Sequence, residues 1–254
     1  MEANLGGDAI NTKGKMTAVR NVIITSQSVN LDGILAAGEN LTVDTRSDLS
    51  NENTEEGFGI TEAGGSLAIK TDKTITNTKK MEAGKTLSLR TAFLTNREHG
   101  EINAGDIALE AKSIYNKGLF NADGLMSAEA EHLYNIETGK IYGGGIRIKA
   151  AHLENRKKEE LESKLSREMQ KLKEAGDALE AAFAADVTAF TTEGQKAAYL
   201  QNIADKTALY DAQKQAVDAV KKEMGRHKAG TIASRGHMRI EGKTLLNSAD
   251  AFLY

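Results

Sequence analysis

The 254-residue sequence contains no cysteine, no proline and no tryptophan, and aromatic residues make up only 5% of it. Without cysteine the chain forms no disulfide and has no thiolate for catalysis or metal binding. Without proline no internal backbone N–H is lost, which favours long, uninterrupted β ladders. Because large rings are scarce, we expect a core of Val, Ile, Leu, Ala and Met.

Charge and hydropathy exclude several classes of partner. The chain has 33 Lys and Arg against 36 Asp and Glu, a formal net charge of −3. A charge so close to balance produces no positive electrostatic field that would attract nucleic acid or an anionic membrane. We therefore expect neither as a partner. No apolar run approaches the roughly 18 residues of a membrane helix. Residues 1–7 lack the basic and apolar regions of a signal peptide, so we expect an internal piece if the natural protein is secreted.

The most informative pattern is a repeat of 19 to 20 residues. Its frame is apolar, any residue, Ala or Gly, Gly, two residues, then apolar-x-apolar, and it closes on apolar-x-Asn. The clear copies cover 59–77, 80–96, 101–116, 119–135 and 140–155, with looser copies at 15–32 and 34–51 and a last one at 230–247. The closing residues are Asn77, Asn96, Asn116, Asn135 and Asn155, spaced 19, 20, 19 and 20. So constant a period indicates one structural unit per repeat.

Two architectures fit this period, a meander of hairpins and a solenoid with one coil per repeat. A meander tolerates variable loops, so the near-constant spacing favours the solenoid. Short alternating segments such as 87–89 become stable when each pairs with the next coil, about 4.8 Å away. We predict that the asparagines bond along a column at a turn. The predicted inward side chains are Leu67, Ile69, Leu87, Leu89, Ile107, Leu109, Leu125, Ile146 and Ile148.

The repeat is interrupted by 72 residues, 157–228, in which the apolar period becomes helical. The first run is Leu161, Leu165, Met169, Leu172, Leu179, Phe183, Val187 and Phe190; the second is Tyr199, Ile203, Tyr210, Val217, Val220 and Met224. Thr192 and Gln195 have the spacing of a capping box, and Gly225 is the predicted C-cap of the second helix. We predict an antiparallel helical hairpin that turns near 191–194, with helices of about 30 residues spanning roughly 45 Å. The predicted organisation is β repeats at 1–156, the α-helical insertion at 157–228 and a resumed coil at 229–254.

Such an insertion is either a binding or spacing element or an inert brace. Long insertions at solenoid corners often carry the binding role. The predicted partner-binding residues lie at the hairpin tip: Phe190, Thr191, Thr192, Glu193, Gln195 and Tyr199. Alternatively, Phe190 and Tyr199 only close the hairpin.

The sequence carries no recognisable catalytic, metal or cofactor motif. The five histidines do not share metal-ligand spacing with a carboxylate on one helix face. Three glycines at 143–145 lack the lysine and helix of a phosphate loop. The acidic residues Glu82, Asp106, Glu129 and Glu137 occupy different repeat positions, unlike the carboxylates that line one sheet of polysaccharide-cleaving β-helices. We expect a non-enzyme without cofactors, with a carbohydrate-active enzyme as a distant alternative.

The segments GENLTVDTRSDLSN (38–51), EINAGDIALEAKSIYNKG (101–118) and AGTIASRGHMRIEGKTLLN (229–247) resemble filamentous haemagglutinin repeats. Those repeats belong to large two-partner-secretion exoproteins of Gram-negative bacteria, which include adhesins and contact-dependent growth inhibition effectors. The resemblance covers about 15–156 and 229–254.

The resemblance implies a right-handed parallel β-helix, secreted through an outer-membrane partner and exposed on the cell surface. It also implies virulence-related adhesion, or toxin delivery after binding a receptor, protein or glycan, on a neighbouring or host cell. We expect the segment to be monomeric. A purely structural stalk with no ligand of its own remains the alternative.

Overall fold

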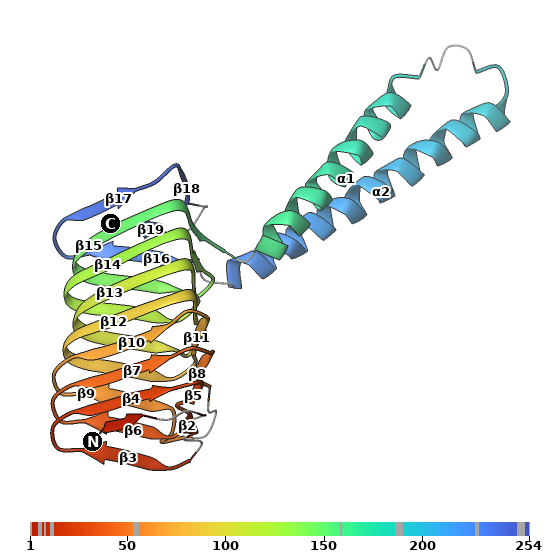
Figure 1. Ribbon diagram of the computed structural model, residues 1–254. Helices are drawn as coiled ribbons and strands as arrows, with labels where there is room; N and C mark the ends of the chain where they lie inside the picture. Colours follow the sequence, from red (N-terminus) through yellow and green to blue (C-terminus); the bar gives the residue numbers. More distant parts are fainter. Residues whose placement is uncertain are drawn as a thin grey trace. The chain divides into compact units, whose positions relative to one another are not determined.

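The computed structural model describes residues 2–4, 7, 9–10, 13–52, 56–157, 159–185, 190–226, 229–247 and 252–253. Over these described residues the protein is mainly β, with two helices (Figure 1). Its early strands are β1 (Glu2–Asn4), β2 (Ala9–Ile10), β3 (Lys15–Ala18), β4 (Val22–Ser26), β5 (Val29–Asn30), β6 (Ile34–Ala37), β7 (Leu41–Thr45), β8 (Leu49–Asn51), β9 (Ile60–Ala63), β10 (Leu67–Thr71) and β11 (Thr74–Asn77). The longer strands β12 (Lys80–Asn96), β13 (Glu101–Asn116), β14 (Leu119–Ile136) and β15 (Lys140–Arg156) follow. Then come α1 (Glu159–Phe183), α2 (Glu193–Arg226), β16 (Thr231–Ser234), β17 (Met238–Glu241), β18 (Thr244–Asn247) and β19 (Phe252–Leu253).

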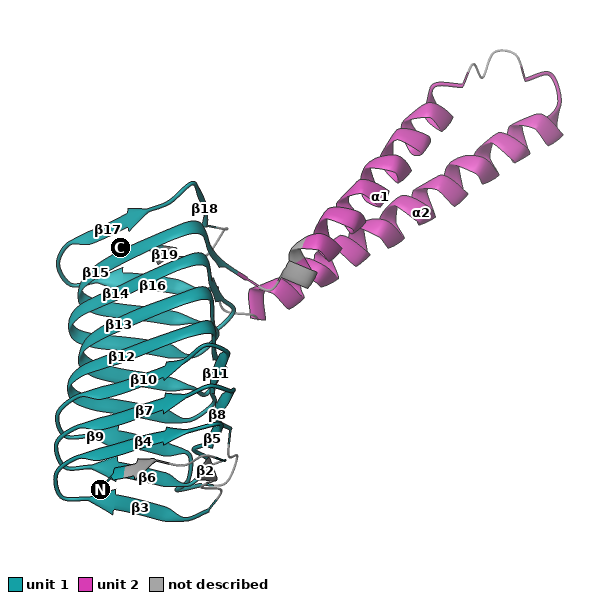
Figure 2. Cartoon of the chain, viewed as in Figure 1, with its two compact units in different colours: residues 1–156, 228–254 teal, residues 157–227 magenta. Residues whose placement is uncertain are grey.

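The chain separates into two compact units (Figure 2). One comprises Met1–Arg156 with Lys228–Tyr254, and the other comprises Lys157–His227. The first holds the strands and the second holds the helices.

The strands form a parallel β-solenoid, as predicted, and the meander is excluded. Each early coil contains three strands, and each strand pairs in parallel with its counterpart one coil away: β3 with β6, β4 with β7 and β5 with β8. From β12 to β15 a single strand runs continuously around each coil, so β9, β10 and β11 all pair with β12. This pairing satisfies backbone groups that such short strands would otherwise leave exposed.

The core consists of aliphatic columns, because residues in register from successive coils point inward together. One column contains Leu41, Leu67, Leu87, Ile107, Met126 and Ile146, each at most 2% exposed. Eight of the nine predicted inward residues are buried, but the prediction for Leu125 is wrong, since its side chain is 46% exposed. The corner before Met126 holds one residue more than the corner before Ile107, and the register shifts there. Met126 therefore takes the inward position.

A ladder of asparagines lines one corner of the solenoid, as predicted. The side-chain Nδ2 of each asparagine donates to Oδ1 of the next at 2.8–2.9 Å. The series is Asn51, Asn77, Asn96, Asn116, Asn135, Asn155 and Asn247, and the first six are fully buried. The same amides also donate to backbone carbonyls, such as Nδ2 of Asn116 to Lys140 O at 3.1 Å. The donating amide groups of the ladder are thus satisfied within the solenoid, whereas Oδ1 of Asn51, at the start of the series, accepts no hydrogen bond from a described residue.

The corner after each asparagine varies in length, and the helices are inserted there. Asn116 is followed by two residues before the next strand and Asn96 by four, whereas Asn155 is followed by Arg156 and the helical unit. The register continues nevertheless, because Ile141 pairs with Ile232, Ile146 with Met238 and Leu153 with Leu245. The backbone N–H of Gly230 donates to Arg156 O at 3.4 Å, so the chain leaves and returns at one point.

The helical unit differs from the prediction at two of its ends. α1 ends at Phe183, so the prediction that it reaches Phe190 is wrong, and Val187 lies outside the described residues. The apolar period continues in the sequence past the end of the helix, so the period alone does not mark where the helix stops. Gly225 is not a C-cap, because α2 continues to Arg226 and Gly225 does not adopt a left-handed backbone. Neither helix, within the described part of the chain, is long and apolar enough to cross a membrane.

The α2 capping box, in contrast, is confirmed. The backbone N–H of Gln195 donates to the Thr192 hydroxyl at 3.2 Å, and the Thr192 N–H donates to Gln195 Oε1 at 3.0 Å. These reciprocal bonds satisfy backbone donors that the start of a helix leaves without partners.

One buried hydroxyl in the solenoid leads to a stability prediction. Thr61 is fully buried in register with Leu35 and Met81, and its Oγ1 makes no hydrogen bond with any described residue. We expect Thr61→Val to raise the free energy of unfolding by about 1 kcal/mol, because valine keeps the volume and removes the unsatisfied group. Urea denaturation followed by circular dichroism measures the change.

The matched control is Thr71→Val. The Thr71 hydroxyl donates to Ser47 O at 2.6 Å. We therefore expect Thr71→Val to lower the free energy of unfolding by about 1 kcal/mol. Equal effects of the two substitutions would contradict the interpretation.

Candidate functional site: a groove and an aromatic face

A groove runs along the solenoid where β12, β13, β14 and β15 turn a corner. Its volume is about 740 Å³, and its lining extends from Thr71 to Lys243. Small residues in register follow its length: Thr91, Ala111, Ala130 and Ala150. The hollow exists because these side chains are short, while longer ones stand on either side.

Charged side chains of both signs line this groove. Arg90, Glu110, Glu129 and Lys149 are in register, and Arg90 pairs with Glu110 at 3.3 Å while Lys149 pairs with Glu129. Glu131 and Glu241 also line the groove. The expectation that no acidic residues gather on one face is therefore wrong. Glu129 belongs to such a group, because residues about 20 apart in the sequence become neighbours.

One ion pair at the groove shifts the pKa values of both its partners. The hydrogen bond from Lys149 lowers the pKa of the Glu129 carboxyl, and the same bond raises the pKa of Lys149. A general acid for glycoside cleavage requires a carboxyl whose pKa is raised. The shift at Glu129 has the opposite direction, because Lys149 already pairs with this carboxylate.

The strand segments that follow the groove carry exposed rings. We call Phe93, Tyr115, His132, Tyr134 and His152 the aromatic face. Phe93, His132 and His152 occupy one outward column, in register with Ser113, and Tyr115 and Tyr134 occupy the next. Phe93 is 46% exposed and Tyr115 is 41% exposed. In a chain with few aromatic residues, this is a notable concentration of rings on one face of the solenoid.

Four of the five rings of the aromatic face, all but Phe93, are linked by ring contacts among the described residues. The centroids of Tyr115 and Tyr134 lie 4.5 Å apart with planes at 20°, and His132 stacks on Tyr134 at 6.0 Å. Burial raises the pKa of the Tyr134 hydroxyl, and the neighbouring Tyr115 and Glu154 raise it further. Nδ1 of His132 is buried and makes no hydrogen bond with any described residue.

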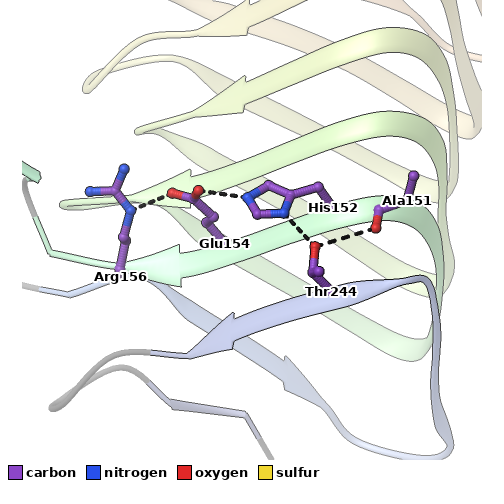
Figure 3. A network of polar contacts seen from close by, with 5 residues as sticks. All are labelled: Ala151, His152, Glu154, Arg156 and Thr244. Atoms are coloured by element: carbon purple, nitrogen blue, oxygen red, sulfur yellow. Dashed lines mark hydrogen bonds and ion pairs between the residues drawn. The ribbon is translucent and has the colours of Figure 1, made fainter.

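A chain of polar contacts joins the aromatic face to the resumed coil (Figure 3). Arg156 Nε contacts Glu154 Oε2, Glu154 Oε1 lies 2.6 Å from His152 Nε2, and His152 Nδ1 contacts the Thr244 hydroxyl. That hydroxyl also donates to Ala151 O at 3.5 Å. Burial alone would raise the pKa of Glu154, but hydrogen bonds from His152 and Arg156 lower it overall.

A hydroxyl, an imidazole and a carboxylate in line are the parts of a proton relay. Here these contacts have a structural role, because they connect β15 to β18, its neighbour in the coil that follows the helices. They also fix the orientation of the His152 ring at the edge of the aromatic face.

The predicted tip residues largely satisfy one another. The rings of Phe190 and Tyr199 lie 5.2 Å apart, and Glu193 pairs with Lys196 at 2.8 Å. The Thr191 N–H donates to Gln195 Oε1 at 2.8 Å, and Gln195 is shared with Thr192. These contacts form three separate groups near the start of α2, and the polar side chains are exposed. The sequence pattern did not predict the groove or the aromatic face, whose signals are the register of Tyr115 with Tyr134 and of Glu110 with Glu129.

Comparison with protein-family models, curated proteins and solved structures finds no match to this chain. Within the described part of the chain, no group of three or more His, Asp or Glu side chains is arranged to hold a metal ion.

Proposed function

We propose that the chain is an extracellular filament segment of a bacterial surface exoprotein and binds a receptor on a neighbouring or host cell. The contact surface is the groove together with the aromatic face, which share the same coils. The role fits an adhesin or a contact-dependent growth inhibition effector that delivers a toxin. Export through an outer-membrane partner belongs to the same proposal, and a chain without cysteine suits it.

One observation carries the proposal: a group of stacked rings, with Tyr115 and Phe93 exposed, borders a groove on a solenoid whose core is mainly aliphatic. Tyrosine and phenylalanine are enriched at recognition surfaces because they bury much area at little conformational cost. Tyr115 and Phe93 retain over 40% exposure, so burying them against a receptor would release water from apolar surface. The charged groups of the groove supply the polar rim that such surfaces require.

Two finer structural inferences accompany this function. We infer an antiparallel helical hairpin, because Lys164 in early α1 pairs with Glu223 in late α2 at 3.2 Å, and Gln213 bonds Glu168 nearer the middle. We also infer a right-handed solenoid, since parallel strand crossovers are right-handed in about 98% of cases.

The test measures binding of the purified chain to target cells. We expect Tyr134→Ala to weaken binding at least about tenfold, the loss typical of a central aromatic contact. Tyr142→Ala, also on the solenoid but outside the aromatic face, is the matched control and should bind normally. Thermal unfolding of both variants separates a loss of contact from a loss of fold.

A second arm tests the tip residues. Deletion of 157–228 with the ends joined should leave binding unchanged if the groove and the aromatic face make the contact. If the deletion abolishes binding while Tyr134→Ala does not, the contact belongs to the helices. If the intact chain binds no cells, the segment is a structural stalk and the proposal fails.

A further inference from the structure

The helical unit leaves large apolar side chains exposed beside a cleft. The cleft has a volume of about 680 Å³ and lies between α1 and α2. Met169 and Phe183 line it and are 51% and 59% exposed, and Leu172, Leu179, Tyr210 and Val217 complete its apolar lining. Helices gain most of their stability by covering an apolar face, so this cleft is suited to another helix.

The arrangement of α1 around the cleft is symmetric. Met169 and Phe183 each lie seven residues from Gly176, and seven residues are about two helical turns, so all three follow one flank of the helix. Gly176 also lines the cleft and leaves it open at its centre. Suppose that α1 of a second copy lies antiparallel to this α1, with the two helices crossing at Gly176. Met169 of each copy would then lie beside Phe183 of the other, which gives two equivalent contacts. Sulfur and aromatic rings attract one another in such contacts.

The charges at the cleft are balanced. Lys173 and Lys221 stand against Asp177 and Glu180, two of each sign. Lys173 pairs with Asp177 within α1 at 2.8 Å. A strongly charged partner finds no complementary field here, whereas a second copy carries the same balanced set. An isologous interface requires this kind of self-complementarity.

We propose that the cleft binds α1 of a second copy of this chain, with a two-fold axis beside Gly176. The two helical pairs then form a four-helix bundle in which each α1 fills the cleft of the other copy. This association replaces the expected monomer and does not depend on receptor binding.

The absence of cysteine permits a direct test by cross-linking. An added Cβ at Gly176 would meet only the Tyr210 ring, at 3.5 Å, so Gly176→Cys should fold normally. With oxidised glutathione as oxidant, we expect the full-length variant to form a disulfide-linked dimer at least tenfold faster than Ala198→Cys, an exposed α2 control outside the cleft. Equal rates for the two variants would overturn the two-fold arrangement.

Sedimentation of the full chain at micromolar concentration gives the second measurement. We expect a dimer whose dissociation constant rises at least tenfold in Phe183→Glu. Leu200→Glu, at a 65% exposed position outside the cleft, should leave the dissociation constant unchanged. Circular dichroism verifies that both variants keep their helices. A monomeric wild-type chain, or equal effects of the two variants, would overturn the proposal.

Discussion

Replacing Asn116 by aspartate is expected to lower the free energy of unfolding by about 3–5 kcal/mol at neutral pH. Nδ2 of Asn116 donates to Asn135 Oδ1 at 2.8 Å and to Lys140 O at 3.1 Å. A carboxylate would instead turn an oxygen toward both acceptors, in a site that is fully buried. The loss therefore combines two missing hydrogen bonds with an unpaired buried charge. Urea denaturation at neutral pH measures it.

The same variant has a predictable pH dependence. Burial and the facing oxygens raise the pKa of the new carboxyl in the folded state above its value in the unfolded chain. Between these two pKa values the folded state binds more protons, so stability falls as the pH rises. The difference in unfolding free energy between wild type and variant should therefore shrink as the pH is lowered through the raised pKa.

Asn103→Asp is the matched control, since Asn103 lies on the same strand with a partly exposed, outward side chain. We expect it to change stability by less than about 0.5 kcal/mol, with little pH dependence. A small, pH-independent effect of Asn116→Asp would show that the asparagine ladder contributes little to stability.

The second large effect is expected from Gly84→Ala. A Cβ built on Gly84 would lie 2.2 Å from the carbonyl oxygen of Gly64, one coil away, and one built on Gly64 would lie 2.3 Å from that of Gly38. The obstacle is backbone, which cannot rotate aside, so the coils must separate locally. We expect a loss of about 2–3 kcal/mol, as for overpacked cores, measured by the same denaturation experiment.

Gly145→Ala provides the contrast, in the equivalent corner of a later coil. There the nearest atom to an added Cβ is His237 O at 3.7 Å, an ordinary contact. We expect a change within about 0.5 kcal/mol. If both substitutions were equally harmful, close approach of the coils would not be the reason for glycine at Gly84.

The solenoid was predictable because its signal is repeated. Asn77 to Asn155 recur at a near-constant spacing that favours stacked coils over a meander of hairpins, and each copy reinforces the others. Leu125 was misplaced because one extra corner residue moves a strand by one position and turns its side chains over. A consensus of repeats does not show such a local shift.

The candidate site was less predictable, for a physical reason. Glu110 and Glu129, or Tyr115 and Tyr134, become neighbours only through stacking, and each is an ordinary surface residue within its own coil. Their significance depends on the exact register between coils. The capping box, in contrast, depends on residues three apart, and it was predicted correctly from Thr192 and Gln195 alone.

The junction at Arg156 and Gly230 has a consequence for protein engineering. A hydrogen bond joins the two ends of the helical insertion. The pairing of β15 with β16, β17 and β18 continues in register as if the inserted residues were absent. The entropy cost of closing a loop grows only slowly with its length. This position should therefore accept a foreign cassette whose termini lie close together, for display on the rod without rebuilding it.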